Sequence, residues 1–121
     1  MSQHVAMPAA VTGGPVTLIN TFTVPPEESG HFLRRWRDNA RVMARKPGFI
    51  GARMHRSLHD DVELRFVNVA EWDSGKSLDA ARANLEFRAT LGRLLGDPAL
   101  HVSASPVDYQ VVIDVDPGDS L

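Results

Sequence analysis

Apolar and polar residues alternate along four stretches of the chain, which is the pattern of β-strands with one buried face. These stretches cover residues 16–24, 49–58, 62–72 and 106–115. The Pro25-Pro26 pair ends the first stretch, and residues 59–61 form a polar turn between the second and the third. In the last stretch one face carries a continuous apolar row, made of Val107, Tyr109, Val111, Ile113 and Val115.

Two other stretches repeat their apolar residues at helical spacing. Residues 26–46 open with a proline and two glutamates, which favours a helix start, and the Pro47-Gly48 pair ends the pattern. Residues 76–95 carry a second helical pattern. We expect a break near Ala83-Asn84 that divides it into two short helices.

The order of the elements is strand, helix, strand, strand, helix, strand. This order predicts an α+β protein with the ferredoxin-like split βαβ arrangement, in which helices cover one face of a four-stranded antiparallel sheet. We expect one domain over residues 15–116, a disordered tail over residues 1–14 and a short polar tail over residues 117–121.

The sheet face opposite the helices is also apolar. It carries Ile19, Val67, Val69 and, by the same alternation, Val112. A bare row of β-branched residues would expose an apolar patch, and pairing two sheets face to face removes it. The sequence therefore predicts a homodimer, a dimeric α+β barrel.

Two polar residues interrupt the face of the strands that points toward the helices. Asn20 sits among Leu18, Phe22 and Val24, and Asn68 occupies the corresponding kind of position in the third strand. A buried carboxamide without partners costs roughly 1–3 kcal/mol, so each side chain either satisfies a neighbouring backbone group or a bound water, or faces a ligand. The first and third strands are neighbours in this fold, so both carboxamides can meet beneath the helices.

Aromatic residues accompany the two asparagines. Trp72 lies four residues after Asn68 on the same face, or roughly 13 Å along a strand, enough to support a ligand of three or four fused rings. We expect Phe22, Phe66 and Phe87 to bind the same ligand. Trp36, in the first helix, is interpreted as a core residue.

Composition narrows the classes of function. A net charge of −2 in 121 residues provides no basic surface for nucleic acid, and the chain has no cysteine. The start of the chain has no signal-peptide pattern, which indicates a cytoplasmic protein without a membrane partner. His55 and His59 fall in a strand and its turn, too far apart for a metal pair, so we expect no metal. We find no nucleotide motif and no Ser-His-Asp arrangement.

Three segments together resemble the antibiotic biosynthesis monooxygenase family: Val16-Thr-Leu-Ile-Asn20-Thr-Phe-Thr-Val-Pro25, Lys46-Pro-Gly-Phe-Ile-Gly51 and Arg65-Phe-Val-Asn68-Val-Ala-Glu-Trp72-Asp-Ser74. Asn20, Asn68 and Trp72 are similar to the catalytic set of cofactor-free anthrone oxygenases in aromatic polyketide pathways. The resemblance implies a dimer that uses O₂ to oxidise a polycyclic phenol or anthrone to a quinone. Some members of the family have a tyrosine shortly after the tryptophan. This chain departs from them, because residues 73–82 contain no tyrosine.

Other functions stay open at this stage. Relatives that assist ring opening with reduced flavin, as in angucycline pathways, use the same kind of pocket. A non-enzymatic dimeric barrel that binds a small ligand is a further alternative, whereas a polyketide cyclase lacks an acid–base pair here. Haem degradation needs an axial histidine on the helix after Trp72, and this chain has Leu91 at that position.

Overall fold

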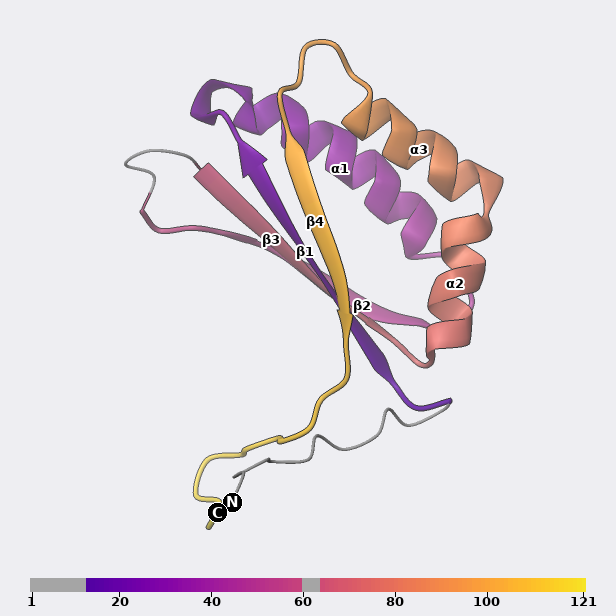
Figure 1. Ribbon diagram of the computed structural model, residues 1–121, viewed down its shortest axis with the longest axis vertical. Helices are drawn as coiled ribbons and strands as arrows, with labels where there is room; N and C mark the ends of the chain where they lie inside the picture. Colours follow the sequence, from indigo (N-terminus) through magenta and orange to yellow (C-terminus); the bar gives the residue numbers. More distant parts are fainter. Residues whose placement is uncertain (1–12, 60–63) are drawn as a thin grey trace, which may run out of the picture.

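The computed structural model describes residues 13–59 and 64–121, and it confirms the ferredoxin-like α+β fold (Figure 1). Four antiparallel strands lie in the order β2-β3-β1-β4, and three helices cover one face of the sheet. The elements are β1 Val16–Val24, the 3₁₀ turn η1 Pro26–Glu28, α1 Ser29–Met43, β2 Phe49–Arg56, β3 Leu64–Trp72, α2 Gly75–Ala83, α3 Leu85–Leu95 and β4 Ser103–Tyr109. Most of the predicted N-terminal tail and the centre of the turn after His59 lie outside the described residues.

The helix boundaries follow local capping chemistry. The first helix begins later than the sequence pattern predicts, because residues 26–28 form a 3₁₀ turn. The predicted break in the second helical stretch is confirmed at Asn84. There the Asn84 side chain accepts a hydrogen bond from the Phe87 amide at 3.1 Å and caps α3. Ser74 caps α2 in the same way, because its hydroxyl accepts from the Ser77 amide at 3.1 Å. None of the helices in the described ranges is long and apolar enough to cross a membrane.

The last strand differs from its prediction at both ends. It was expected over residues 106–115, whereas β4 begins at Ser103 and ends at Tyr109. Tyr109 pairs with Thr17 of β1, and β1 begins at Val16 just after Pro15, which has no amide hydrogen to donate. Residues 111–115 therefore extend past the end of their neighbour, and they run away from the sheet in Figure 1.

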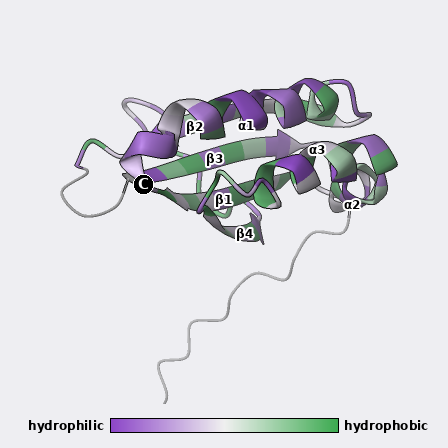
Figure 2. Ribbon diagram, turned by 90° about the horizontal axis from the view of Figure 1, so that it is seen from above, coloured by the Kyte–Doolittle hydropathy of each residue, from purple (hydrophilic) through white to green (hydrophobic). Residues whose placement is uncertain are grey.

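The core between sheet and helices forms two apolar clusters. The first surrounds Trp72 and contains these buried residues: Leu18, Val42, Met43, Ala70, Trp72, Leu78, Ala81 and Phe87. The second contains three phenylalanines and three aliphatic residues: Phe22, Phe32, Phe66, Val24, Leu94 and Leu100. We call them the tryptophan cluster and the phenylalanine cluster. In Figure 2 much of β3 is hydrophobic, while α1 alternates between hydrophilic and hydrophobic residues, as expected for a helix with one buried face.

An ionic contact fastens α1 to the loop after α3. The Asp97 carboxylate accepts a hydrogen bond from the Ala99 amide at 2.9 Å, lies 2.7 Å from His31 Nε2 and accepts from Arg35 Nε at 3.0 Å. These contacts lower the pKa of Asp97 from its ordinary value of 3.8 to about 2, with the Ala99 amide making the largest contribution and His31 the next. The folded state therefore favours the ionised carboxylate.

We expect Asp97→Asn to lower the melting temperature near neutral pH, with a deficit that shrinks in acid. The stabilisation from a carboxylate with a depressed pKa is complete above its unfolded pKa and is lost as pH falls through the folded value. The difference in melting temperature between wild type and variant should therefore be constant above about pH 5 and should disappear as the pH falls from about 4 to about 2. Thermal melts followed by circular dichroism at several pH values measure it. Asp38→Asn, which removes an exposed ion pair with Arg41, should change little at any pH. A deficit for Asp97→Asn that does not vary with pH would contradict this account.

Candidate active site

The two predicted asparagines lie directly opposite one another on the two central strands. Asn20 of β1 pairs with Asn68 of β3, between the pairs Leu18–Ala70 and Phe22–Phe66. Because alternate residues share a face, both carboxamides point toward the helices, as the sequence predicted. They also separate the two apolar clusters, since the Leu18–Ala70 pair belongs to the tryptophan cluster and the Phe22–Phe66 pair to the phenylalanine cluster. We call these two side chains the carboxamide pair.

Each carboxamide keeps a buried polar atom without a partner. Oδ1 of Asn20 and Oδ1 of Asn68 are buried and accept no hydrogen bond, and Nε1 of Trp72 is buried and donates none. An unsatisfied buried polar group costs about 1–3 kcal/mol. These are the three residues that the sequence proposed as catalytic, and all lie on the helix-facing side of the sheet. The two Oδ1 atoms therefore serve no neighbouring backbone group, and a catalytic role for these three residues stays a prediction.

Trp72 occupies a more enclosed position than the sequence suggested. It pairs with Val16 at the last position of β3, and its side chain is 0% exposed. The Phe49 ring packs against the indole edge to face, at 5.3 Å between centroids. Trp72 thus forms the end wall of the tryptophan cluster, with its indole nitrogen as the polar group that remains unsatisfied there.

Two half-buried residues of the helical layer pack against both clusters, on either side of the carboxamide pair. They are Trp36 of α1 and Leu91 of α3. Trp36 was interpreted from the sequence as a core residue, but it also lines a surface groove beside β2. Helical spacing alone could not distinguish these positions, because the flank of a helix and its buried face differ by a single residue step.

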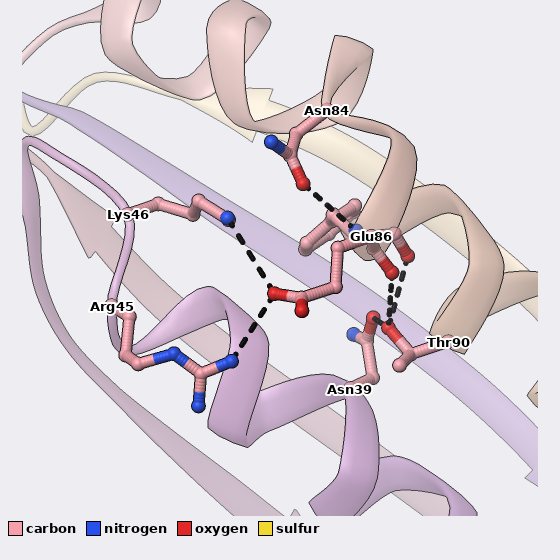
Figure 3. Close-up of polar contacts among 7 residues, drawn as sticks. Asn39, Arg45, Lys46, Asn84, Glu86 and Thr90 are labelled. Carbon is pink, nitrogen blue, oxygen red and sulfur yellow. Dashed lines mark hydrogen bonds and ion pairs between the residues drawn. The ribbon is translucent and has the colours of Figure 1, made fainter.

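Polar contacts between α1 and α3 set the position of this layer (Figure 3). The Thr90 hydroxyl lies 2.8 Å from Oδ1 of the buried Asn39 and 3.0 Å from the Phe87 carbonyl. Nearer the surface, Glu86 contacts Arg45 at 3.1 Å and Lys46 at 3.8 Å. Thr90 precedes Leu91, so these contacts hold Leu91 at a fixed height above the sheet.

The three predicted ligand-binding phenylalanines are all buried, but they do not lie together. Phe22 and Phe66 sit side by side, and Phe32 of α1 contacts both rings, at centroid distances of 5.0 and 5.1 Å. Phe66 also lines the groove beside β2. Phe87 belongs to the tryptophan cluster instead. A substrate-binding role for these residues stays a prediction.

The walls on either side of the carboxamide pair are the two apolar clusters. Within residues 13–59 and 64–121, no group of three or more histidine, cysteine or acidic side chains is arranged to hold a metal ion. The carboxamide pair itself offers hydrogen bonding by neutral groups, while the Asp108 carboxylate of β4, paired with Arg82, lies opposite Leu18 on the same side of the sheet. Rotating a carboxamide by 180° exchanges its oxygen and its NH₂ group, so each asparagine can accept from a ligand or donate to it.

A comparison with protein families decides the family. The model for antibiotic biosynthesis monooxygenase matches residues 15–93. The chain belongs to this family. Its structure is similar to that of SnoaB, a cofactor-independent oxygenase from Streptomyces nogalater, with a TM-score of 0.70 and 26% identity over 84% of this chain and 97% of SnoaB. It is also 28% identical to a heme oxygenase (mycobilin-producing) of Mycobacterium tuberculosis over 101 residues, 84% of this chain and 92% of that protein. Both relatives, with the family match, indicate an oxygenase.

The residues of this family member do not fit a haem. A haem iron is held in such proteins by a side chain such as histidine. Leu91, at the position where the sequence comparison expects that histidine, is apolar and packs against both clusters. The histidines with described contacts are engaged elsewhere: His31 with Asp97, His101 with Glu28, and His55 with the Val67 carbonyl. His55 also shares the helix-free face of the sheet with Val67. The site therefore offers apolar walls and carboxamides, but no axial ligand.

Proposed function

We propose that this protein is a cofactor-independent oxygenase that uses O₂ to oxidise a polycyclic phenol or anthrone-type substrate to a quinone. The observation that carries the proposal is the carboxamide pair: two facing asparagines between the apolar clusters, each with a buried Oδ1 atom that has no partner. Apolar walls suit the fused rings, and the amides suit a carbonyl or phenolate oxygen on them. The similarity to a cofactor-independent oxygenase supports the same assignment.

The proposed reaction needs only the substrate and O₂. The anthrone loses a proton from its CH₂ carbon to water, and the resulting carbanion spreads its charge onto the ring oxygen. Electron transfer to O₂ and radical recombination form a C–O bond and give a hydroperoxide. Loss of water from that intermediate leaves a carbonyl, so one CH₂ and one O₂ become one C=O and one H₂O.

The residues of the site contribute binding and electrostatics to this reaction. The NH₂ groups of Asn20 and Asn68 donate hydrogen bonds to the ring oxygen as its negative charge develops, in the manner of an oxyanion hole. Trp72 and the phenylalanines provide the apolar surroundings, in which such hydrogen bonds are stronger than in water. Water or an ionised phenol of the substrate takes the proton.

We expect the purified protein to be colourless and to oxidise an anthrone-type substrate, such as dithranol, in air without added flavin, metal or NADPH. An oxygen electrode measures consumption, and mass spectrometry of the product under ¹⁸O₂ should show the label in the new carbonyl. Heat-denatured protein at equal concentration corrects for autoxidation of the substrate. Activity that strictly requires reduced flavin would instead support the ring-opening alternative.

We also propose that two copies pair through their helix-free sheet faces. Ile19, Val67 and Val69 lie on that face. Val107 and Tyr109 of β4 pair with Ile19 and Thr17 and extend the apolar area, with 43% and 47% of their surface exposed. Val112, which the alternation assigned to this face, lies beyond the end of β4 instead. A second copy would cover this patch, which is otherwise unfavourable in water.

Light scattering after size exclusion should give about twice the chain mass of 13.3 kDa. Val69→Arg places a charge at the centre of the apolar face and should produce monomers, because an unpaired buried charge is strongly unfavourable. Leu85→Arg is the matched control, since Leu85 is an exposed apolar residue of α3 and its replacement should leave the mass unchanged. A wild-type protein that is monomeric at micromolar concentration would refute the pairing.

A further inference from the structure

A pocket lies beside the tryptophan cluster, between the loop after α1 and one side of α2. Its volume is about 300 Å³, at the lower end of the range for small-molecule sites. The residues that line it include no acidic side chain: Lys46, Pro47, Lys76, Ser77, Ala80, Ala81 and Asn84. The chain as a whole has a net charge of −2, and Lys46 and Lys76 are its two lysines. We call this site the lysine pocket.

The Lys46 ammonium is largely enclosed, and within the described part of the chain it donates no hydrogen bond. Only 17% of its side chain is exposed, and its ion-pair partner, Oε1 of Glu86, lies 3.8 Å away, which is too far for a hydrogen bond. Arg45 holds the same oxygen more closely, at 3.1 Å (Figure 3). Glu86 therefore compensates the charge of Lys46 only in part. An ammonium taken out of water in this way is stabilised by an anion that accepts its hydrogen bonds.

Two neutral donors of the pocket are oriented by contacts on their other side. Oδ1 of Asn84 accepts a hydrogen bond from the Phe87 amide at 3.1 Å, which fixes the carboxamide and leaves its NH₂ group as the end that can donate to a ligand. The Ser77 hydroxyl accepts from the Ser74 hydroxyl at 3.1 Å, so its own hydrogen stays available. Both Asn84 and Ser77 are half-buried.

Lys76 supplies the second positive charge, from the first turn of α2. Its side chain is exposed, and it forms no ion pair with any residue in the ranges 13–59 and 64–121. Two ammonium groups, one hydroxyl and one amide NH₂ thus line a single small volume. The remaining lining residues, Pro47, Ala80 and Ala81, are apolar.

This set of donors matches a phosphate group better than a carboxylate. A phosphate monoester carries a charge of about −1.5 to −2 at pH 7 and has three strong acceptor oxygens, which suits two ammonium groups and two neutral donors. A carboxylate has one charge and two oxygens. A phosphate group fills only part of a volume of about 300 Å³, and the apolar lining residues adjoin the rest.

We propose that the lysine pocket binds a phosphate group, either as free phosphate or as the phosphate of a small ester, with Lys46 and Lys76 as its ionic anchors. The bound group links the loop after α1 with α2 and with the start of α3, because Lys46, Lys76 and Asn84 come from these three segments. Neither Asn20 nor Asn68 lines this pocket, so the inference does not depend on the proposed function.

Titration of the ¹⁵N-labelled protein with inorganic phosphate and with phenyl phosphate, followed by NMR, tests the site. The signals of the Asn84 side-chain amide and the Ser77 backbone amide should shift, with a Kd of about 1 mM or lower at low ionic strength. Acetate at equal ionic strength should bind at least about fivefold more weakly, because it has half the charge. A lower Kd for phenyl phosphate than for phosphate identifies an ester as the ligand, and equal values identify free phosphate.

Variants show whether the two lysines are responsible. Lys46→Gln should raise the Kd of phosphate about five- to tenfold, and Lys76→Gln about two- to fivefold, since Lys76 is the more exposed of the two. Arg88→Gln is the matched control, because Arg88 is an exposed arginine of α3 that does not line the pocket. It should change the Kd less than twofold.

Thermal stability gives a second measurement. A phosphate concentration of about 50 mM should raise the melting temperature of the wild type by about 5 °C or more relative to chloride at equal ionic strength, because a ligand of the folded state stabilises it. The double variant of Lys46→Gln and Lys76→Gln should show no such rise. Phosphate shifts that persist in the double variant, or an effect of Arg88→Gln equal to that of the lysine variants, would overturn the proposal. Either result leaves the proposed function as it stands.

Discussion

Replacing Asn20 or Asn68 with alanine should lower kcat about 10²–10³-fold, the effect of removing one oxyanion-hole donor in other enzymes. Both carboxamides lie between the apolar clusters with their buried Oδ1 atoms unpartnered, and rotation by 180° brings the NH₂ group to that place, where it can donate to a substrate oxygen. Their loss strands no other group of the protein. The melting temperature should therefore stay within a few degrees of wild type. Both kcat and the melting temperature are measured on each variant.

Asn39→Ala is the control for a buried asparagine with a structural role. Asn39 is buried like Asn68, at 5% and 4% exposure, but its Oδ1 lies 2.8 Å from the Thr90 hydroxyl. Losing that hydrogen bond should cost about 0.5–1.5 kcal/mol of stability and leave turnover per folded molecule near normal. If Asn20→Ala and Asn68→Ala behaved as this control does, with reduced stability and intact turnover, the catalytic assignment would be wrong.

The meeting of the two asparagines could be predicted because it depends on two regular features. Strand alternation fixes the face on which each side chain lies, and the order of elements makes the first and third strands neighbours. The direct pairing of Asn20 with Asn68 depends on register, which the apolar residues on either side constrain: a slip by one residue would turn Phe22 and Phe66 toward the opposite face.

The end of β4 could not be predicted in the same way. Alternation of apolar residues continues to Val115, yet the strand ends at Tyr109 because the neighbouring β1 begins at Val16. A sequence pattern shows that a segment can pair, but not whether a partner reaches that far.

The groove beside β2 depends on tertiary placement that no single segment reveals. Trp36 and Arg37 are consecutive residues of α1, and Met54 and Arg56 are alternate residues of β2, so each group looks ordinary by itself. They form a recess because the flank of α1 lies above the edge of the sheet. The sequence could have placed Met54 beside Asn68 only after the register of β2 on β3 was known.

Gly48 lies beside the start of β2, the end of β3 and the start of α2. Its backbone conformation explains why the helical pattern of the sequence ends at Pro47-Gly48. Its φ of +84° lies in the left-handed region, which L-residues with a side chain adopt at a cost. Its carbonyl accepts a hydrogen bond from the Asp73 amide at 2.8 Å, which ties the start of β2 to the end of β3 next to Trp72. A Cβ atom at this position would lie 2.5 Å from Asp73 Oδ1 and against the Ser77 hydroxyl.

Gly48→Ala should therefore destabilise the protein by at least about 2 kcal/mol, the sum of the left-handed backbone and the overpacking against α2. For a chain of this size that corresponds to a fall in Tm of roughly 8 °C or more, measured by calorimetry. Gly92→Ala is the control: Gly92 lies in α3, a Cβ there meets nothing within 4 Å, and alanine should raise stability by about 0.5–1 kcal/mol through its higher helix propensity. A Gly48→Ala variant as stable as wild type would mean that the loop accommodates a side chain, and that the tie between β2, Asp73 and α2 does not depend on this conformation.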